Sequence, residues 1–248
     1  MADKYFAVPQ GKVYIASRDA NGQTSGFTWI GDTDGFTITT TQQYLDIQES
    51  YSGNRGTVAH IPTSSDYAAE LSILNINGEN LARAFYGESA AVAGAAVVGE
   101  AVTAFNGQMS ALKYPDVSAV TVKKGATTLV AGTDYTLDAK FGTITILPGS
   151  TQVTGSTGVA LTVDYTHGAI ASRMKLLTQG LKDYTLRFEG VSKFDDLAQV
   201  GVIHRIALDM AQTLSLIGTG VNKLVVKGKL LPAAEQPAGE SQYFTYLQ

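Results

Sequence analysis

Short segments in which apolar and polar residues alternate, separated by glycine-rich turns, run through most of this sequence. The clearest lies between Gly132 and Gly149, GTDYTLDAKFGTITILPG, where two alternating runs flank a glycine turn and a proline-glycine pair ends the second. Alternation with a period of two places successive side chains on opposite faces of a β-strand. Glycine and proline mark the turns between such strands. The pattern therefore predicts antiparallel sheets.

One segment predicts a helix with well-marked ends. In NGENLARAFYG, Asn77 or Gly78 can cap the start, Leu81 and Phe85 lie four residues apart, and Gly87 closes the end. Helix content is then well below the roughly 30% of typical globular proteins. We therefore expect a mainly β fold.

The segments before this helix predict long strands. GKVYIASRDA and the turn NGQTSG, which begin at Gly11, predict a hairpin. Strands are also expected over Gly35–Ser50, with one apolar and one polar face, and over Asp66–Ile76. Between them, Tyr51–Ser65 (YSGNRGTVAHIPTSS) carries glycines, a proline and hydroxyl residues, which predict a long loop or an open hairpin arm.

The last third of the chain returns to strands. Lys182–Gly190 predicts a strand, and Ser192–Gln199 a doubtful helical turn. Val200–Ala211 fits a strand or a helix, and we favour a strand because NKLVVKGKLLP would make a good antiparallel partner. GTGVNK, near Gly218, predicts a hairpin turn, and the terminal AAEQPAGESQYFTYLQ a flexible or partner-docked tail.

The middle of the chain has the strand spacing of a small β-sandwich. We expect one outer β domain split in sequence, residues 1–88 and 170–248, with an inserted module at 89–169. Ala90–Phe105 is rich in alanine and glycine, contains Glu100 and is too short to span a bilayer. It predicts a linker leading into a buried strand.

The residue types for catalysis or metal binding are scarce. The chain has no cysteine, which excludes disulfides, a thiol nucleophile and thiolate metal sites. The three histidines, His60, His167 and His204, lack metal-ligand spacing, so structural roles are favoured. No phosphate-loop or nucleophile-elbow motif is present. We expect no enzyme and no cofactor.

Two pairs of aspartates leave alternatives open. Asp32 with Asp34, and Asp195 with Asp196, fit acid-base or cation-binding carboxylates, but turn chemistry is the favoured interpretation.

The surface composition points to partners. Charged residues make up 16% of the chain, below the roughly 25% of soluble domains, and the net charge is -4. Such depletion suggests that neighbouring subunits cover much of the outer face. The N-terminus lacks a signal-peptide pattern, which predicts folding in a cytosol.

Taken in order, these segments resemble the major tail tube proteins of long non-contractile-tailed bacteriophages (siphophages). The resemblance covers nearly the whole chain and lies in the order of its elements. It implies a tail-tube β-sandwich or barrel with one short flanking helix, plus an inserted immunoglobulin-like β-sandwich. The stretches that carry it are GKVYIASRDA, FTWIGDTDGFTITT, YSGNRGTVAHIPTSS, NGENLARAFYG, VTVKKGATTLVAGTDYTLDAKFGTITILPGS and GVALTVDYT.

The resemblance implies a structural protein of the virion tail, assembled in the host cytoplasm. Copies of the chain would form hexameric rings that stack into a hollow tube, with a tape-measure protein and other tail proteins as further partners. Phage DNA would pass through the lumen without specific binding, and neither a cofactor nor a membrane would be involved.

Two sets of residues follow from this resemblance. Asp46 and Glu49 are lumen-facing candidates, because an acidic lumen would repel the DNA phosphates. The alternative for both is a solvated strand face.

The arm would contact the next ring through Tyr51, Arg55, His60 and Pro62. In particular, Arg55 and His60 would pair with acidic residues of that ring.

Two other functions remain open. A carbohydrate- or surface-binding β-sandwich would stack sugars on Trp29, Tyr51, Tyr67 and Tyr86. A capsid decoration or joining protein would share the β-rich character but form closed rings or trimers.

Overall fold

The computed structural model describes residues 9–193 and 196–247. These residues form seventeen strands, β1 to β17, and one helix, α1. The predicted mainly β class is confirmed. The contacts divide the chain into two compact units. Unit 1 comprises residues 1–89 and 174–248, and unit 2 comprises residues 90–173. The sequence predicted the domain boundaries at 88/89 and 169/170.

Unit 1 is built on one antiparallel sheet with the strand order β2-β1-β14-β15-β16-β4-β3. A further strand, β17, pairs with β15 at Val200–Ile203, whereas β16 pairs with β15 only at Ile206–Leu208. The bounds are β1 Pro9–Ser17, β2 Thr28–Trp29, β3 Thr33–Gln48, β4 Thr57–Ile73, β14 Asp183–Ser192, β15 Ala198–Leu208, β16 Leu224–Leu230 and β17 Phe244–Leu247.

The core of unit 1 follows the alternation in its strands. Val13 and Ile15 of β1 are buried, as are Leu71 and Ile73 of β4 and Ile203 of β15. The helix α1 (Gly78–Ala84) begins at the predicted cap, where the side chain of Asn77 accepts from the Asn80 amide. Leu81 and Phe85 pack against the same core. The strand interpretation of residues 200–211 is confirmed for residues 200–208, where β15 ends.

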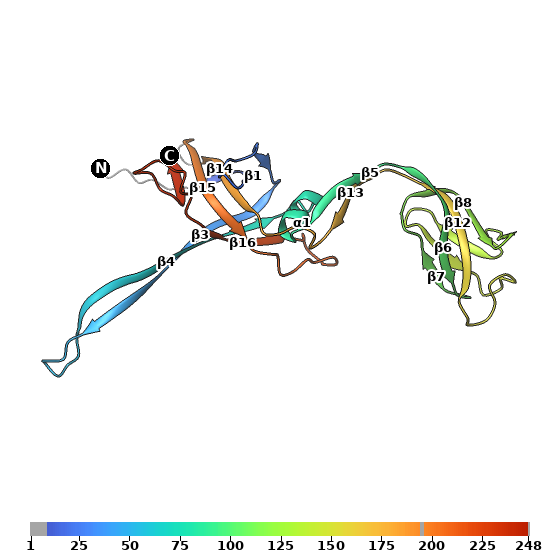
Figure 1. Ribbon diagram of the computed structural model, residues 1–248, viewed down its shortest axis with the longest axis horizontal. Helices are drawn as coiled ribbons and strands as arrows, with labels where there is room; N and C mark the ends of the chain where they lie inside the picture. Colours follow the sequence, from blue (N-terminus) through green and yellow to red (C-terminus); the bar gives the residue numbers. More distant parts are fainter. Residues whose placement is uncertain (1–8, 194–195, 248) are drawn as a thin grey trace. The chain divides into compact units, whose positions relative to one another are not determined.

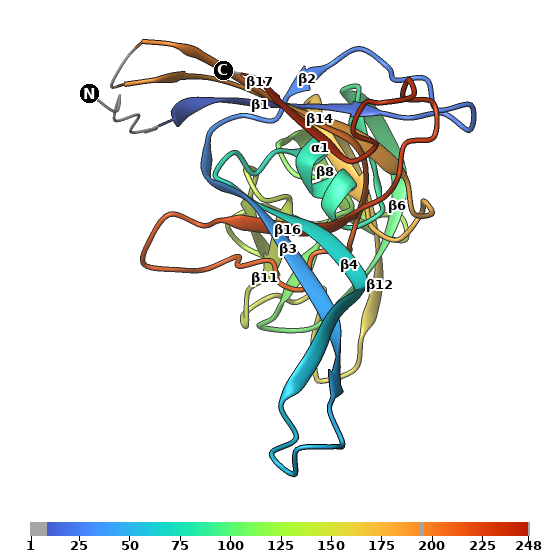
Figure 2. The ribbon, with the colours of Figure 1, turned by 90° about the vertical axis from the view of Figure 1, so that its left-hand side faces the viewer.

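The segment predicted as a loop at residues 51–65 is mostly strand. β4 begins at Thr57, so the turn between β3 and β4 spans only residues 49–56. Figures 1 and 2 show the distal halves of β3 and β4 running away from the rest of unit 1 as a paired ribbon. Pro62 fits into β4 because the register shifts beside it and β16 pairs with β4 only from Ala68 to Ile73.

Two further expectations in unit 1 were wrong. The C-terminal segment is not a flexible tail: β17 pairs with β15, and Tyr243 packs on Tyr67 with ring centroids 4.8 Å apart. The turn predicted near Gly218 is part of a longer loop, residues 209–223, between β15 and β16. The predicted helical turn at Ser192–Gln199 includes residues outside the described part, and its described ends belong to β14 and β15.

Unit 2 has a core shared by two antiparallel sheets, of order β10-β11-β7 and β6-β12-β8-β9. Ile144 and Ile146 of the first sheet and Val122, Leu161 and Val163 of the second are buried in this core. The bounds are β6 Ala95–Ala104, β7 Met109–Ala111, β8 Val117–Lys124, β9 Thr127–Thr128, β10 Tyr135–Asp138, β11 Thr143–Ile146 and β12 Val159–His167.

The hairpin predicted between Gly132 and Gly149 is present in unit 2. β10 pairs with β11 antiparallel, with Tyr135 opposite Ile146. Residues 90–105, in contrast, are not a linker but strands β5 (Glu88–Val92) and β6. β5 pairs with β13 (Ile170–Lys175), the strand at the other chain crossing. The chain thus enters and leaves unit 2 through paired strands, which keeps the ends of the inserted segment close together.

Candidate assembly surfaces

The distal part of the β3–β4 hairpin exposes apolar side chains that nothing among the described residues covers. Leu45 and Ile47 of β3 lie opposite Ile61 and Ala59 of β4. Leu45, Ile47 and Ile61 are 54%, 46% and 44% exposed. One apolar face was expected here, but not its exposure. An isolated two-stranded hairpin is only marginally stable in water. A partner that buries the exposed apolar side chains would therefore stabilise this ribbon.

The other face of the ribbon holds a small polar cluster. His60 Nδ1 lies 2.5 Å from Asp46 Oδ1 on the facing strand. The ring of Tyr44 stacks on His60, with centroids 4.0 Å apart and an interplanar angle of 16°. Both His60 and Asp46 are more than half exposed. The sequence prediction paired His60 with a carboxylate of a neighbouring ring, whereas here its partner is Asp46 of its own chain.

The remaining predicted residues lie in or beside the 49–56 turn. Glu49 accepts a hydrogen bond from Ser52, and its amide donates to Gly56 O at 2.9 Å. Tyr51 is 87% exposed at the turn. Arg55 has a positive φ of 49°, which fixes the backbone there in the left-handed region. The structure thus places all six predicted site residues in one hairpin, with Pro62 opposite Tyr44.

The β3 strand has an unprotected edge. Within residues 9–193 and 196–247, β3 pairs only with β4. Its sequence, TDGFTITTTQQYLDIQ, contains no proline and no lysine. Natural edge strands are usually blunted by lysine, proline, bulges or short length. Of the three register shifts between β3 and β4, the first leaves its extra residue, Asp34, in β3, and the other two leave theirs in β4. The stretch from Gly35 to Gln48 therefore has no bulge of its own, no lysine and no proline, and it can pair with another strand.

The edge strand of unit 2 provides a contrast. In β6 the register shifts near Gly99, which has a positive φ of 71°. Glu100 beside it accepts from the Lys113 amide at 2.8 Å and from the Tyr165 hydroxyl. Burial, together with the hydrogen bond to Glu100, raises the pKa of Tyr165. A bulge and an inward carboxylate thus protect β6 within the strand, whereas the bulge of β3 lies near the start of that strand, at Asp34.

A strip of paired charges on β16 and β4 was missed by the sequence analysis. Lys227 Nζ lies 3.1 Å from Glu70, and Lys229 Nζ lies 2.7 Å from Asp66. The hydrogen bond to Asp66 raises the pKa of Lys229. Glu70 also lies opposite the uncharged Thr37 of β3, so the polar face beside these charges continues onto a third strand. The spacing of Asp66 with Glu70 and of Lys227 with Lys229 was the available signal, but it needed the register.

The other histidines have structural contacts. His167 is buried and stacks on Tyr114 at 4.1 Å. His204 Nε2 lies 2.9 Å from Thr245 Oγ1 of β17. Among the residues with described positions, no three His, Asp or Glu side chains converge as metal ligands would.

The predicted pair Asp32 and Asp34 is not a cluster of convergent carboxylates. Asp32 accepts from the Leu74 amide through its backbone carbonyl at 2.9 Å, while the Asp34 carboxylate pairs with Lys223. Asp195 lies outside the described residues, and Asp196 adopts a positive φ of 56°.

The aromatic residues of the sugar-binding alternative differ in exposure. Trp29 is 45% exposed and lies under the Lys12 ammonium, 5.3 Å from the ring centroid. Tyr67 packs against the core, and the Tyr86 hydroxyl donates to Leu208 O at 2.7 Å.

In the described part of the chain, no helix has the length and apolar character needed to cross a membrane.

These features define a mainly β chain with a protruding hairpin and an open sheet edge. The chain belongs to the family described as "Protein of unknown function UCP028589", whose model matches residues 6–247. A search of curated proteins found no match to this chain.

Proposed function

We propose that this protein is a structural, non-enzymatic subunit that polymerises through its sheet into the tail tube of a long non-contractile-tailed bacteriophage. The observation that carries the proposal is that β3 has an open backbone edge and that the distal part of the β3–β4 hairpin is exposed on both faces. Both features leave a single copy with unpaired backbone groups and uncovered apolar side chains, which a neighbouring copy would satisfy.

The two ends of the sheet support the proposal of a ring. The free edge of β3 lies at one end of the strand order, and short β2 with β1 lies at the other. Pairing of β3 with a neighbour extends the sheet, and a closed ring of copies leaves no edge. We expect six copies per ring because the chain resembles the major tail tube proteins.

The lumen of such a tube would be lined by the polar side of β3, β4 and β16. The ion pairs of Glu70 and Asp66 with Lys227 and Lys229 balance the charge of this strip. A surface without excess positive charge does not bind the DNA phosphates strongly, so DNA would slide through. Of the two acidic residues expected to face the lumen, Glu49 lies in the turn beyond β3, whereas Asp46 alternates with Leu45 and Ile47 and so lies on the other face of β3 from Thr37 and Thr41.

The hairpin would contact the next ring. Its turn presents Tyr51 and Arg55, and its strands present Leu45, Ile47 and Ile61. Unit 2, inserted into the sequence of unit 1, would add bulk to each subunit. A tape-measure protein and other tail proteins would be further partners in the virion tail.

Electron microscopy of negatively stained protein over a range of concentrations tests the proposal. We expect hollow tubes of uniform width from the wild type. The double variant Thr37→Lys, Thr41→Lys should stay unassembled, because edge lysines block strand pairing while each faces a carboxylate of β4. The control is Thr136→Lys, Thr166→Lys, which changes exposed strand threonines of unit 2.

The outcomes separate the alternatives. Closed rings or trimers that never grow would favour a capsid decoration protein. A wild type that remains monomeric in sedimentation runs at the highest soluble concentration would contradict the proposal.

A further inference from the structure

Unit 1 contains a groove with both apolar and polar walls that no other part of the described chain fills. Its volume is about 640 Å³, and β1 and β3, which do not pair with each other, both contribute to it. The walls are formed by Val13, Phe36, Ile38, Phe188 and Phe244.

The floor of the groove is kept open by Gly201 of β15. A Cβ at this position would stand 3.2 Å from the Phe244 ring. Concave sites of this size, with apolar side chains and a few polar groups in their walls, are those in which proteins bury apolar groups of a ligand or partner.

A second feature of unit 1 is the loop of residues 209–223, which carries uncovered apolar side chains. Leu216, Ile217 and Val221 are 81%, 95% and 74% exposed. The tip is held in a defined shape: the Ser215 hydroxyl donates to Ile217 O at 3.2 Å, and the Asn222 amide donates to Ser215 O at 3.0 Å. An apolar tip ordered before binding loses little conformational entropy on docking.

The base of the loop is fixed to its own unit. The Ala211 amide donates to Ala84 O of α1 at 2.8 Å, and Lys223 pairs with Asp34. The contacts of Ala211 and Lys223 fix both ends of the loop, and the hydrogen bond of Asn222 fixes its tip. The side chains of Leu216 and Ile217 are therefore exposed to solvent and do not enter the groove of the same chain.

We propose that the tip of this loop docks into the groove of a second copy of the chain. The two surfaces match in charge: no residue from Met210 to Asn222 is charged, and the one charged residue lining the groove, Asp34, is already paired with Lys223. Burial of the contact therefore leaves no charge without a partner, which would be costly.

The groove also shares Phe36 and Ile38 with β3, so the docking site is continuous with the edge proposed to pair between copies. The loop and the groove are different patches of one chain. Their contact is head-to-tail, the type that produces rings or filaments. This inference rests on the self-assembly proposed above and names one contact that drives it.

Disulfide trapping tests the contact directly, because the natural chain has no cysteine. The full-length double variant Ile38→Cys, Ile217→Cys, oxidised mildly, should give a ladder of cross-linked oligomers on a non-reducing gel. Each single variant should give at most dimers. The matched control is Thr136→Cys, Ile217→Cys, in which the first cysteine lies on an exposed strand of unit 2 and should give no ladder.

A second variant measures the energetic role of the loop. Leu216→Ser, Ile217→Ser should raise the concentration at which tubes first form at least tenfold, while the thermal unfolding of the unassembled chain is unchanged. Tubes of the wild type without a ladder in the Ile38→Cys, Ile217→Cys variant would overturn the loop contact and leave the assembly proposal intact. Absence of any wild-type assembly would overturn both.

Discussion

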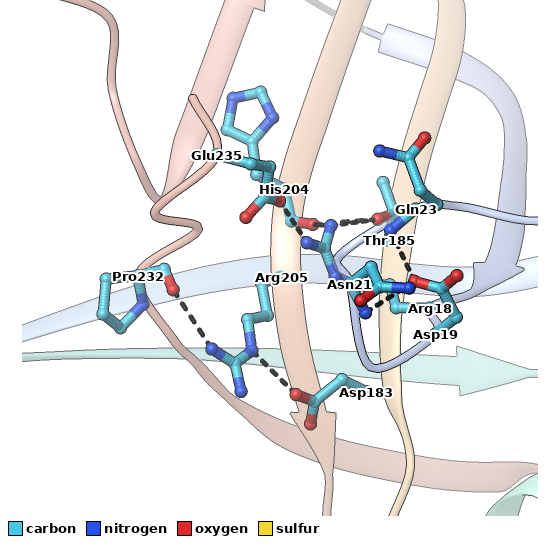
Figure 3. A network of polar contacts seen from close by, with 10 residues as sticks. All are labelled: Arg18, Asp19, Asn21, Gln23, Asp183, Thr185, His204, Arg205, Pro232 and Glu235. Carbon is cyan, nitrogen blue, oxygen red and sulfur yellow. Dashed lines mark hydrogen bonds and ion pairs between the residues drawn. The ribbon is translucent and has the colours of Figure 1, made fainter. Parts of the chain in front are cut away.

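The guanidinium of Arg18 pairs with the carboxylate of Glu235, which lies 217 residues away along the chain. Figure 3 shows that the same guanidinium also reaches Thr185 and the His204 carbonyl, at 3.1 and 2.6 Å. The contacts join the end of β1 to β14, β15 and the segment before β17. The Arg18 side chain is only 5% exposed, so this network holds the C-terminal segment on the sheet.

Replacement of Arg18 by methionine should destabilise unit 1. The change keeps much of the side-chain bulk but removes the partner of the Glu235 carboxylate and the donor to Thr185 Oγ1, while the His204 carbonyl keeps its hydrogen bond from the Thr185 hydroxyl. We expect a cost of about 1–3 kcal/mol. Urea unfolding followed by the fluorescence of Trp29, the one tryptophan of the chain, reports on unit 1. The control Arg187→Met removes an exposed ion pair with Glu189 and should change stability by less than about 0.5 kcal/mol.

His204 should make unit 1 less stable in mild acid. Burial lowers the pKa of His204, Arg18 lowers it further, and Glu235 and Glu240 partly oppose this. Because the folded pKa is below the unfolded value of 6.5, the unfolded chain binds the proton more readily. Stability is therefore full above about pH 6.5 and falls as the pH drops below it, by less than about 1.4 kcal/mol per pH unit.

The variant His204→Gln isolates this effect. Glutamine can still bond to Thr245 but does not titrate, so the stability of the variant should depend less on pH between 7 and 5. Equal slopes for the two proteins in Trp29-monitored unfolding would contradict the assignment.

Alternation was sufficient to predict most strands but not those that depend on distant partners. Residues 57–65 contain a proline and several hydroxyl residues, and they are a strand only because β3 pairs with them. β17 likewise forms because β16 leaves β15 beyond Ile206, which opens an edge at Val200–Ile203. Neither partner is visible in the local sequence.

The candidate site was located by segment but not by contact. A long loop or open hairpin arm was predicted from the glycines, proline and hydroxyl residues of Tyr51–Ser65. The Asp46–His60–Tyr44 cluster, in contrast, depends on a register shifted by an extra residue near Pro62. The Lys227–Glu70 ion pair was missed for the same reason, because it also depends on the register between strands.

Gly142 should be essential to the hairpin of unit 2 that the sequence marked so clearly. It has a positive φ of 63°, and a Cβ there would stand 2.2 Å from the Tyr114 carbonyl oxygen. Gly142→Ala should therefore destabilise unit 2 by about 1–3 kcal/mol or more, while the Trp29-monitored transition of unit 1 is unchanged. Circular dichroism measures both transitions together.

The control for this prediction lies at the end of the same segment. A Cβ at Gly149 would meet nothing within 4 Å, so Gly149→Ala should be nearly neutral. Similar losses for the two variants would show that the contact with Tyr114 is not the cause.

Gln199 should be a site at which removal of a polar group stabilises the protein. The side chain is fully buried on β15, and neither its amide nitrogen nor its oxygen has a hydrogen-bond partner in the described structure. A buried amide without partners costs about 1–3 kcal/mol. Gln199→Met keeps a similar length without that cost, so Trp29-monitored unfolding should show a gain of about 1–2 kcal/mol. The exposed control Gln23→Met should shift stability by less than about 0.5 kcal/mol. A loss of stability on replacing Gln199 would instead mean that its amide is satisfied in the folded chain.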